Sequence, residues 1–412
     1  MKILLVNTFD TIGGPGRWVY MMHRNFLRTQ ADSVYLVDRK FSNDATVLGA
    51  GGKISDLKSR MKQVIDYLPL VLYPRWKKVI FSVGWAPFDI DRMVNKLKPD
   101  IVHLNWINRG FISIQSLRRI QAPIVWTMHD MWSFTGGCHY DEECGRYQSG
   151  CGQCPILGSD RDGDLSSAVL NKKKKYWRDI NLTMVAPSRW LCDCAYRSFL
   201  FRDARVEHIP VGMDLEVFAP TKKEEARKIL GLPFDKKLVL FGAVNAVDDR
   251  RKGFKYLIDA LKILTREKDR LELLIFGSTQ SDDVRRCNLK ANFLGNIADN
   301  HRMSLVYSAA DVFVAPSRQD NMPATVMESL ACGTPVVAFD IGGMPDMIEP
   351  MKNGYLAKPF QSDDLARGIK WVVDHVDQVA LSNRSRAKMM AEYNIKDIAR
   401  RYLDLYKNIL CQ

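Results

Sequence analysis

One carboxylate in this 412-residue chain has surroundings that favour chemistry. Glu328 is the only charged residue between Asn321 and Phe339, in a helical segment that is otherwise apolar. A buried carboxylate without a partner costs at least roughly 1–3 kcal/mol, so we expect hydrogen-bond donors around it. Sugar or ribose hydroxyl groups would serve, which predicts a polyol ligand. The alternative is a glutamate at the solvent edge of a partly buried helix.

Two strand–loop–helix units must position this residue. Residues 311–315 and 335–339 are short apolar runs typical of buried parallel strands. After the first run, Pro323 favours a helix start, and Gly342-Gly343 follows the second run. In open α/β sheets, ligands lie at the carboxyl ends of the strands, where helix N-termini favour anionic groups. The stretch therefore predicts a site for an anionic ligand.

A similar arrangement is predicted near the N-terminus. Residues 2–7 form an apolar run, residues 13–17 read GGPGR, and residues 18–28 predict an amphipathic helix. Backbone N–H groups can approach an anion where side chains are absent, so Gly14 and Gly16 are candidates for phosphate contact. The alternative is a tight connection without a ligand.

A histidine ends another predicted strand. Residues 123–128 are mostly apolar, and His129-Asp130 follows them directly. At the carboxyl end of a strand, an imidazole can bond a sugar hydroxyl or a reacting oxygen. A lone histidine in such a place also fits a structural role.

Four of the nine cysteines lie within seventeen residues. They are Cys138, Cys144, Cys151 and Cys154. In a cytosolic chain this clustering favours zinc over disulfides, and four thiolates would hold a long loop that has little core of its own. A structural zinc site, ordinary thiols and a redox pair are the three interpretations.

The charge of the chain favours anionic partners. The net charge is +13 and the pI is near 9.2, which suits nucleotide phosphates, polyanionic saccharides or an acidic membrane surface. Basic residues are spread along the chain and no nucleic-acid-binding motif is present, so we expect no nucleic-acid partner. No apolar run approaches the ~18–20 residues of a membrane span, and residues 1–6 are too short for a signal-peptide core. We expect a cytoplasmic protein.

Residues 53–85 combine basic and apolar character. From Lys53 to Lys78 there are seven Lys/Arg residues and two Asp residues, interleaved with apolar and aromatic side chains. This pattern fits a helix that lies on an anionic membrane surface. It fits equally a helical insertion packed on its domain, because an amphipathic helix serves both purposes.

The stretch from Asp320 to Gly343 resembles the signature of family four, the retaining glycosyltransferases of the GT-B fold that use nucleotide sugars. That family carries Glu, seven residues, Glu, a small-residue helix end, Gly-x-Pro-Val-Val and a Gly-Gly loop. This chain has Asp320, seven residues, Glu328, then GTPVV at 333–337 and Gly342-Gly343. The departure is Asp320, which is one methylene shorter and keeps the charge. Weaker similarities extend over nearly the whole chain.

The resemblance implies roles for individual residues. Asp320 would contact the donor sugar ring, Lys252 would stabilise the leaving diphosphate, and His129 would act on the acceptor side, so these three are the implied catalytic residues. Ala243 stands where the family has an arginine, which implies that a neighbouring arginine supplies the charge. The implied donor-binding residues are Glu328, Arg250, Arg251, Gly342, Gly343 and Asn321, and Gly14 and Gly16 would face the acceptor. No cofactor is implied for catalysis.

The same resemblance implies the architecture. We expect an α/β chain of two Rossmann-like domains facing a central cleft. Residues 1–214 would bind the acceptor and include the cysteine loop 138–154, residues 215–390 would bind the nucleotide sugar, and residues 391–412 would form a helix that crosses back to the first domain.

The implied activity is transfer of a hexose from a UDP- or GDP-sugar, with retention, to a saccharide acceptor. The acceptor is expected to be lipid-linked, on the inner face of a bacterial membrane, in exopolysaccharide or lipopolysaccharide synthesis of the colanic-acid type. The alternatives are a non-catalytic nucleotide-sugar-binding scaffold, a GT-B sugar epimerase and a phosphorylase.

Overall fold

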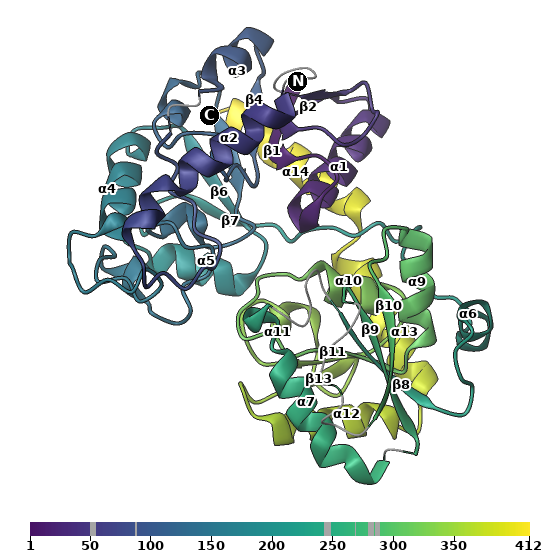
Figure 1. Cartoon of the computed structure of the whole chain (residues 1–412). Coiled ribbons are helices and arrows are strands. Elements are labelled where there is room, and N and C mark those ends of the chain that lie inside the picture. The colour runs from purple at the N-terminus through teal and green to yellow at the C-terminus, as the bar shows by residue number, and fades with distance from the viewer. Residues whose placement is uncertain (50–54, 87–88, 243–248, 268, 279–283, 285–288) are drawn as a thin grey trace. The chain divides into compact units, whose positions relative to one another are not determined.

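Two parallel sheets organise the chain. The computed structural model describes residues 1–412 except 50–54, 87–88, 243–248, 268, 279–283 and 285–288. The contacts divide the chain into unit 1, residues 1–211 with 396–412, and unit 2, residues 212–395 (Figure 1). Each unit holds one parallel sheet covered by helices, which confirms the predicted α/β class with two Rossmann-like domains. Of the helices in the described ranges, none is long and apolar enough to span a membrane.

The sheet of unit 1 has the strand order β3-β2-β1-β4-β5-β6-β7. Its strands are β1 (Lys2–Phe9), β2 (Asp32–Arg39), β3 (Val47–Gly49), β4 (Ile101–Leu104), β5 (Ile124–Thr127), β6 (Leu182–Ala186) and β7 (Val206–His208). The chain moves outward from β1 to β3 and then returns to place β4 on the other side of β1. Ligands of such sheets bind where the strand order reverses, which here is the carboxyl end of β1 and β4.

Helices surround this sheet. They are α1 (Gly13–Arg28), α2 (Ser55–Tyr67), α3 (Asp91–Leu97), α4 (Leu165–Trp177), α5 (Arg189–Arg197) and α14 (Ile395–Leu410), with short 3-10 turns η1 (Leu68–Leu72), η2 (Ser116–Arg119), η3 (Trp132–Phe134) and η4 (Arg146–Gln148). The helix expected at 18–28 begins five residues earlier, so the glycines of GGPGR form its first turn. A Cβ on Gly16 would lie 2.9 Å from the Phe9 carbonyl oxygen, which explains the glycine.

The C-terminal helix α14 is tied into unit 1 through buried polar contacts. The Tyr406 hydroxyl lies 2.6 Å from His103 Nδ1, and the Thr127 hydroxyl lies 2.8 Å from both His103 Nε2 and the Tyr402 hydroxyl. His103 is fully buried and stacks on Tyr402. This histidine therefore fastens the helix to the sheet.

The buried His23 is expected to make the folded chain less stable in mild acid. Burial lowers the pKa of His23 to about 4, and its two ring nitrogens bond the hydroxyls of Ser33 and Thr46. The unfolded histidine has a pKa near 6.5, so below that pH the unfolded chain binds more protons than the folded one. Stability that is present above pH 6.5 is therefore lost as the pH falls towards 4. We expect His23→Gln to reduce this loss by roughly 3 kcal/mol in urea unfolding of the full chain.

The control for this measurement is His301→Gln, because His301 is exposed on a helix of unit 2. It should leave the pH dependence as in the wild type. An unchanged pH dependence in His23→Gln would contradict the assignment of a neutral, buried imidazole.

The sheet of unit 2 has the strand order β10-β9-β8-β11-β12-β13. Its strands are β8 (Lys237–Gly242), β9 (Leu271–Phe276), β10 (Lys290–Gly295), β11 (Val312–Ala315), β12 (Val336–Phe339) and β13 (Gly354–Ala357). The helices are α6 (Lys223–Leu230), α7 (Phe254–Ile263), α9 (Asn300–Ala309), α10 (Ala324–Ala331), α11 (Met344–Met347), α12 (Ser362–Val373) and α13 (Gln378–Glu392), with 3-10 turns η5 (Arg250–Lys252) and η6 (Leu264–Glu267). The strand order reverses between β8 and β11, which places the carboxyl ends of these strands at the ligand-binding position.

Candidate active site

Two cations contact a carboxylate near the carboxyl ends of β8 and β11 in unit 2. Lys252 Nζ lies 2.7 Å from Asp320 Oδ2, and an Arg251 guanidinium nitrogen lies 3.0 Å from the same oxygen. The cations come from η5, before α7, and Asp320 lies in the loop between β11 and α10. The resemblance to family four implied that all three residues belong to the donor site, and the fold brings them into direct contact. Arg250, the other candidate cation, is exposed.

The electrostatics of this cluster keep Asp320 ionised. Burial by itself would raise the pKa of Asp320, but the charges and hydrogen bonds of Lys252 and Arg251 outweigh it and lower that pKa to about 2. Only 5% of Asp320 is exposed to solvent. Arg251 also lies 3.5 Å from Asp249 Oδ2, so two basic side chains and two carboxylates meet here. The two basic side chains are the groups of this cluster that suit an anionic ligand.

Glycines allow the loops of the cluster to approach one another. Gly253 has φ +71°, and a Cβ there would lie 1.8 Å from the Pro316 carbonyl oxygen. Gly342 has φ +54°, and its Cβ would lie 2.0 Å from the Asp320 carbonyl oxygen. The N–H of Gly343 donates to that same carbonyl oxygen at 3.1 Å. The Gly342-Gly343 loop is thus fastened to the segment that carries Asp320.

Glu328 is buried on α10 and has a partner within the protein. It is 4% exposed, and the Tyr307 hydroxyl on α9 donates to Glu328 Oε2 at 2.8 Å. The solvent-edge alternative is therefore wrong. Asn321 is also buried, and its N–H donates to Asp320 Oδ1 at 3.2 Å. Ala243 lies outside the described residues.

His129 lies at the carboxyl end of β5 in unit 1. Its Nε2 is 3.0 Å from Asn105 Oδ1. Its ring packs edge-on against Trp18, with 5.4 Å between the two ring centroids. Burial lowers the pKa of His129 to about 4, against a smaller raising effect of Asp130. The imidazole is therefore neutral at physiological pH, and it lies in the same unit as the first turn of α1 with Gly14 and Gly16.

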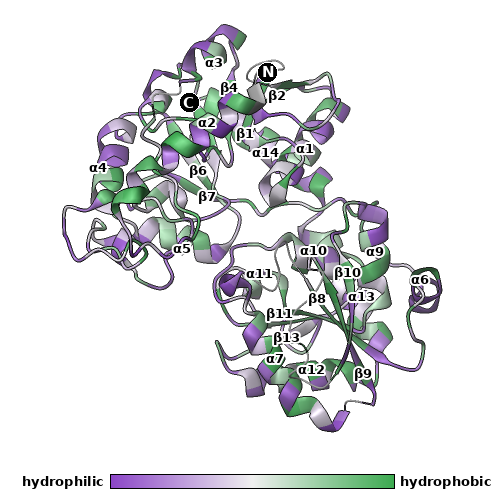
Figure 2. Cartoon of the chain, viewed as in Figure 1, coloured by the Kyte–Doolittle hydropathy of each residue, from purple (hydrophilic) through white to green (hydrophobic). Residues whose placement is uncertain are grey.

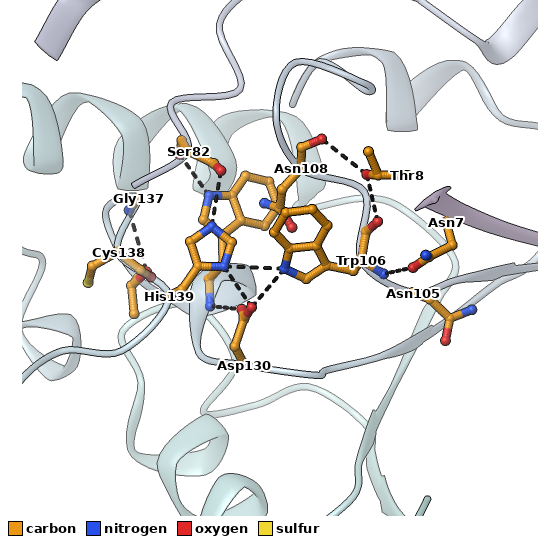
Figure 3. A network of polar contacts seen from close by, with 12 residues as sticks. Asn7, Thr8, Ser82, Asn105, Trp106, Asn108, Asp130, Gly137, Cys138 and His139 are labelled. Carbon is orange, nitrogen blue, oxygen red and sulfur yellow. Dashed lines mark hydrogen bonds and ion pairs between the residues drawn. The ribbon is translucent and has the colours of Figure 1, made fainter. Parts of the chain in front are cut away.

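A polar network that no sequence pattern predicted follows His129 (Figure 3). The Nδ1–H of His139 donates to Asp130 Oδ2 at 2.6 Å, and His139 Nε2 lies 3.0 Å from the Ser82 hydroxyl. The Trp106 indole N–H donates to the same Asp130 oxygen at 2.9 Å. Ser82 precedes α3 and His139 belongs to the cysteine loop, so the network joins distant segments at the ends of β4 and β5. The signal in the sequence is the run of polar and aromatic residues directly after each strand.

The four cysteines of the loop are free thiols. Burial raises the pKa of each, to about 12 for Cys151, which favours the protonated form. In the part of the chain that the structure describes, which includes this loop, no three His, Cys, Asp or Glu side chains are arranged to hold a metal ion. Structural zinc at these four cysteines therefore stays a prediction.

A buried lysine fixes the segment that precedes the cysteine loop. Lys173 on α4 is fully buried, and its ammonium donates to the carbonyl oxygens of Trp132 and Thr135. The ammonium also lies 3.7 Å from the centroid of the Trp132 ring. These contacts fix Trp132 and Thr135, between Asp130 and the cysteine loop.

Comparisons with known proteins match nearly the whole chain. A family model described as "Glycosyltransferase Family 4" matches residues 12–217, half of the chain, and one described as "Glycosyl transferases group 1" matches residues 222–397. A putative colanic acid biosynthesis glycosyl transferase, WcaC of Escherichia coli K12, is 24% identical over 443 residues, covering 99% of this chain and 100% of the relative.

Solved structures share the fold. Sucrose-phosphate synthase from Thermosynechococcus elongatus superposes with a TM-score of 0.72 at 20% identity, covering 100% of this chain and 99% of that one. HepE of Anabaena in complex with UDP-glucose superposes with a TM-score of 0.63 at 15% identity, covering 99% of this chain and 100% of that one. At these identities the likeness establishes the two-domain architecture.

Proposed function

Because the chain belongs to glycosyltransferase family 4, we propose that it transfers a hexose from a nucleoside-diphosphate sugar to a saccharide acceptor with retention of anomeric configuration. The observation that carries this proposal is the cluster in which Lys252 and Arg251 contact the buried Asp320, at the carboxyl edge of the unit 2 sheet. The structural neighbour HepE with bound UDP-glucose supports the choice of donor.

The donor diphosphate would be held by the cations of this cluster. Cleavage of the sugar–phosphate bond builds negative charge on the leaving diphosphate, and Lys252 with Arg251 would stabilise that charge. Asp320 would release one cation to the diphosphate and accept a hydrogen bond from a hydroxyl of the donor sugar. Glu328, oriented by Tyr307, would accept hydrogen bonds from the ribose hydroxyls.

The acceptor would bind to unit 1 near His129 and the first turn of α1. A neutral imidazole can exchange hydrogen bonds with a sugar hydroxyl without adding charge to the site. The full-length similarity to an Escherichia coli protein named for colanic acid biosynthesis supports a saccharide acceptor in bacterial surface polysaccharide synthesis. We propose a lipid-linked saccharide at the inner face of the membrane.

A screen of nucleotide binding tests this function. The purified full chain would be melted with UDP, GDP, ADP and their common sugar conjugates, because a ligand that binds the folded state raises the melting temperature. We expect an upward shift specific to one base. No shift with any nucleotide, at concentrations far above a plausible Kd, would count against the proposed donor class.

An exposed apolar face on α2 and η1 supports association with a membrane. This face, which we call the α2 face, carries large apolar side chains at helical spacing. Figure 2 shows hydrophobic and hydrophilic residues alternating along the ribbon of α2. They are Leu57 (64% exposed), Met61 (54%), Val64 (62%), Leu68 (50%), Val71 (78%) and Leu72 (81%). The exposed basic residues Lys58, Arg75 and Lys78 lie in the same stretch. Apolar groups that enter a bilayer, flanked by cations that meet anionic headgroups, are typical of peripheral membrane helices.

The α2 face predicts binding to anionic vesicles. We expect the full chain to sediment with phosphatidylglycerol–phosphatidylcholine vesicles and much less with phosphatidylcholine alone. The double variant Val71→Glu, Leu72→Glu should weaken this binding at least about tenfold, because each lost side chain contributes roughly 1.5–3 kcal/mol of apolar burial. Val376→Glu is the control, since Val376 is 99% exposed in unit 2. Equal sedimentation of the double variant would exclude the α2 face as the membrane contact.

A further inference from the structure

Trp106 follows the carboxyl end of β4, and each of its polar atoms makes a hydrogen bond. Its backbone N–H donates to Asn7 Oδ1 at 2.8 Å, and its carbonyl oxygen accepts from the N–H and hydroxyl of Thr8, both at 2.8 Å (Figure 3). Its indole N–H donates to Asp130, which His139 and Ser82 fix in turn. The side chain is nevertheless only partly buried. Rigid placement of a partly exposed aromatic residue is typical of a binding surface.

Arg109 stacks on this tryptophan. Its guanidinium carbon lies 5.6 Å from the centroid of the Trp106 ring and 5.7 Å from the centroid of the Phe9 ring. Guanidinium groups stack on aromatic faces in this way while their N–H groups stay available to oxyanions. Within the described residues, no carboxylate lies within salt-bridge distance of Arg109. The aromatic rings therefore hold a cation whose charge no acidic side chain of the described residues neutralises.

Two neighbouring residues of this turn carry buried donors. Arg109 Nε and the neighbouring Asn108 Nδ2 are both buried and have no hydrogen-bond partner in the part of the chain that the structure describes. Asn108 is 4% exposed, and Figure 3 places its side chain beside Trp106. Buried polar groups are nearly always hydrogen-bonded, so two adjacent orphan donors indicate a missing acceptor group.

The backbone of this turn is also unusual. Arg109 has φ +58°, a left-handed conformation that is costly for a residue with a side chain, and Gly110 follows with φ +72°. A Cβ on Gly110 would lie 2.4 Å from the Lys62 carbonyl oxygen, so the turn is pressed against α2. Residues held in such conformations concentrate at ligand sites, where the strain positions a side chain.

We propose that Arg109, supported by Trp106 and Phe9 and assisted by Asn108, binds an anionic group of the acceptor. The anion would be a phosphate or a carboxylate, because both offer the oxygen acceptors that the guanidinium fork and the two orphan donors lack. The site lies at the end of β1 and β4, where the strand order of unit 1 reverses. This inference rests on the proposed function for the identity of the ligand as an acceptor, but the anion site itself does not depend on it.

The indole N–H resonance of Trp106 provides a local measurement. In the ¹⁵N-labelled full chain this resonance is assigned by its absence in Trp106→Phe. Titration with inorganic pyrophosphate and, separately, with glucuronate should shift it in a saturable way with at least one of the two anions, whereas glucose should not. Saturation by pyrophosphate alone would indicate a phosphate-bearing acceptor, and saturation by glucuronate alone would indicate an acidic sugar.

The variants separate this site from the donor site. Arg109→Gln should raise the Kd of the anion at least tenfold. Asn108→Leu should also raise this Kd, although it keeps the charge of Arg109. Arg118→Gln, which changes an exposed arginine on η2, should leave the Kd unchanged. Other tryptophan indole resonances report whether each variant is folded. No saturable shift with either anion, or the same shift in Arg109→Gln, would overturn the proposal. Nucleotide-induced melting shifts should persist in Arg109→Gln, so a failure of donor binding remains distinguishable from a failure of this site.

Discussion

Lys252→Ala is expected to lower the kcat for sugar transfer by about 100- to 1,000-fold. Lys252 is one of two cations in contact with Asp320, and charge on the leaving diphosphate grows as the sugar–phosphate bond breaks. Removal of one electrostatic donor to a developing negative charge typically costs this much in kcat, because the interaction is stronger in the transition state than in the ground state. The measurement is initial-rate transfer from the donor that the nucleotide screen identifies.

Lys255→Ala is the matched control for this variant. Lys255 lies three residues further along, on α7, with an exposed side chain, so its loss changes the net charge equally without touching the cluster. It should retain wild-type kcat. Because Lys252→Ala also removes one partner of the buried Asp320, its melting temperature must be compared with that of the wild type, so that a loss of folding is not read as a loss of catalysis. Transfer by Lys252→Ala within a factor of three of the wild type would contradict the assigned role.

Glu328→Gln is expected to raise the Kd for the donor nucleotide about 10- to 100-fold. A hydrogen bond to a charged acceptor contributes about 1.5–3 kcal/mol, and the exchange keeps the size of the side chain while removing its charge. Tyr307→Phe should have a smaller effect in the same direction, since it removes only the hydroxyl that orients Glu328. Isothermal titration calorimetry with the nucleoside diphosphate measures both.

Glu225→Gln provides the comparison, because Glu225 is an exposed glutamate on α6 of the same unit. It should bind nucleotide like the wild type. A folded Glu328→Gln variant with an unchanged Kd would show that Glu328 is a structural partner of Tyr307 and that the ribose is bound elsewhere.

The sequence predicted the elements better than their contacts. The strands expected at 311–315 and 335–339 are β11 and β12, because parallel strands buried on both faces are continuous apolar runs. Lys252 and Asp320 were both predicted, yet their contact spans 68 residues and depends on how two loops meet. Arg251, and not Arg250, joins them, since successive side chains in a 3-10 turn point about 120° apart and the sequence does not say which one faces inward.

Residues outside the motifs were missed for a different reason. Tyr307 lies in a helix without any distinguishing pattern, and its role depends on the packing of α9 against α10. A buried tyrosine needs a partner for its hydroxyl, and that requirement is the one signal that could have linked it to Glu328. The network of Asp130, His139 and Ser82 joins three segments that only the folded sheet brings together.

Release of nucleoside diphosphate tests the central claim most directly. The full chain would be incubated with UDP- and GDP-sugars and a bacterial lipid extract that supplies acceptors, and the free nucleoside diphosphate would be measured against Lys252→Ala. The proposed function predicts release from one donor class, dependent on the extract and reduced at least about a hundredfold in the variant. No release above the rate without protein, from any donor, would contradict a transferase and favour a non-catalytic nucleotide-sugar-binding scaffold.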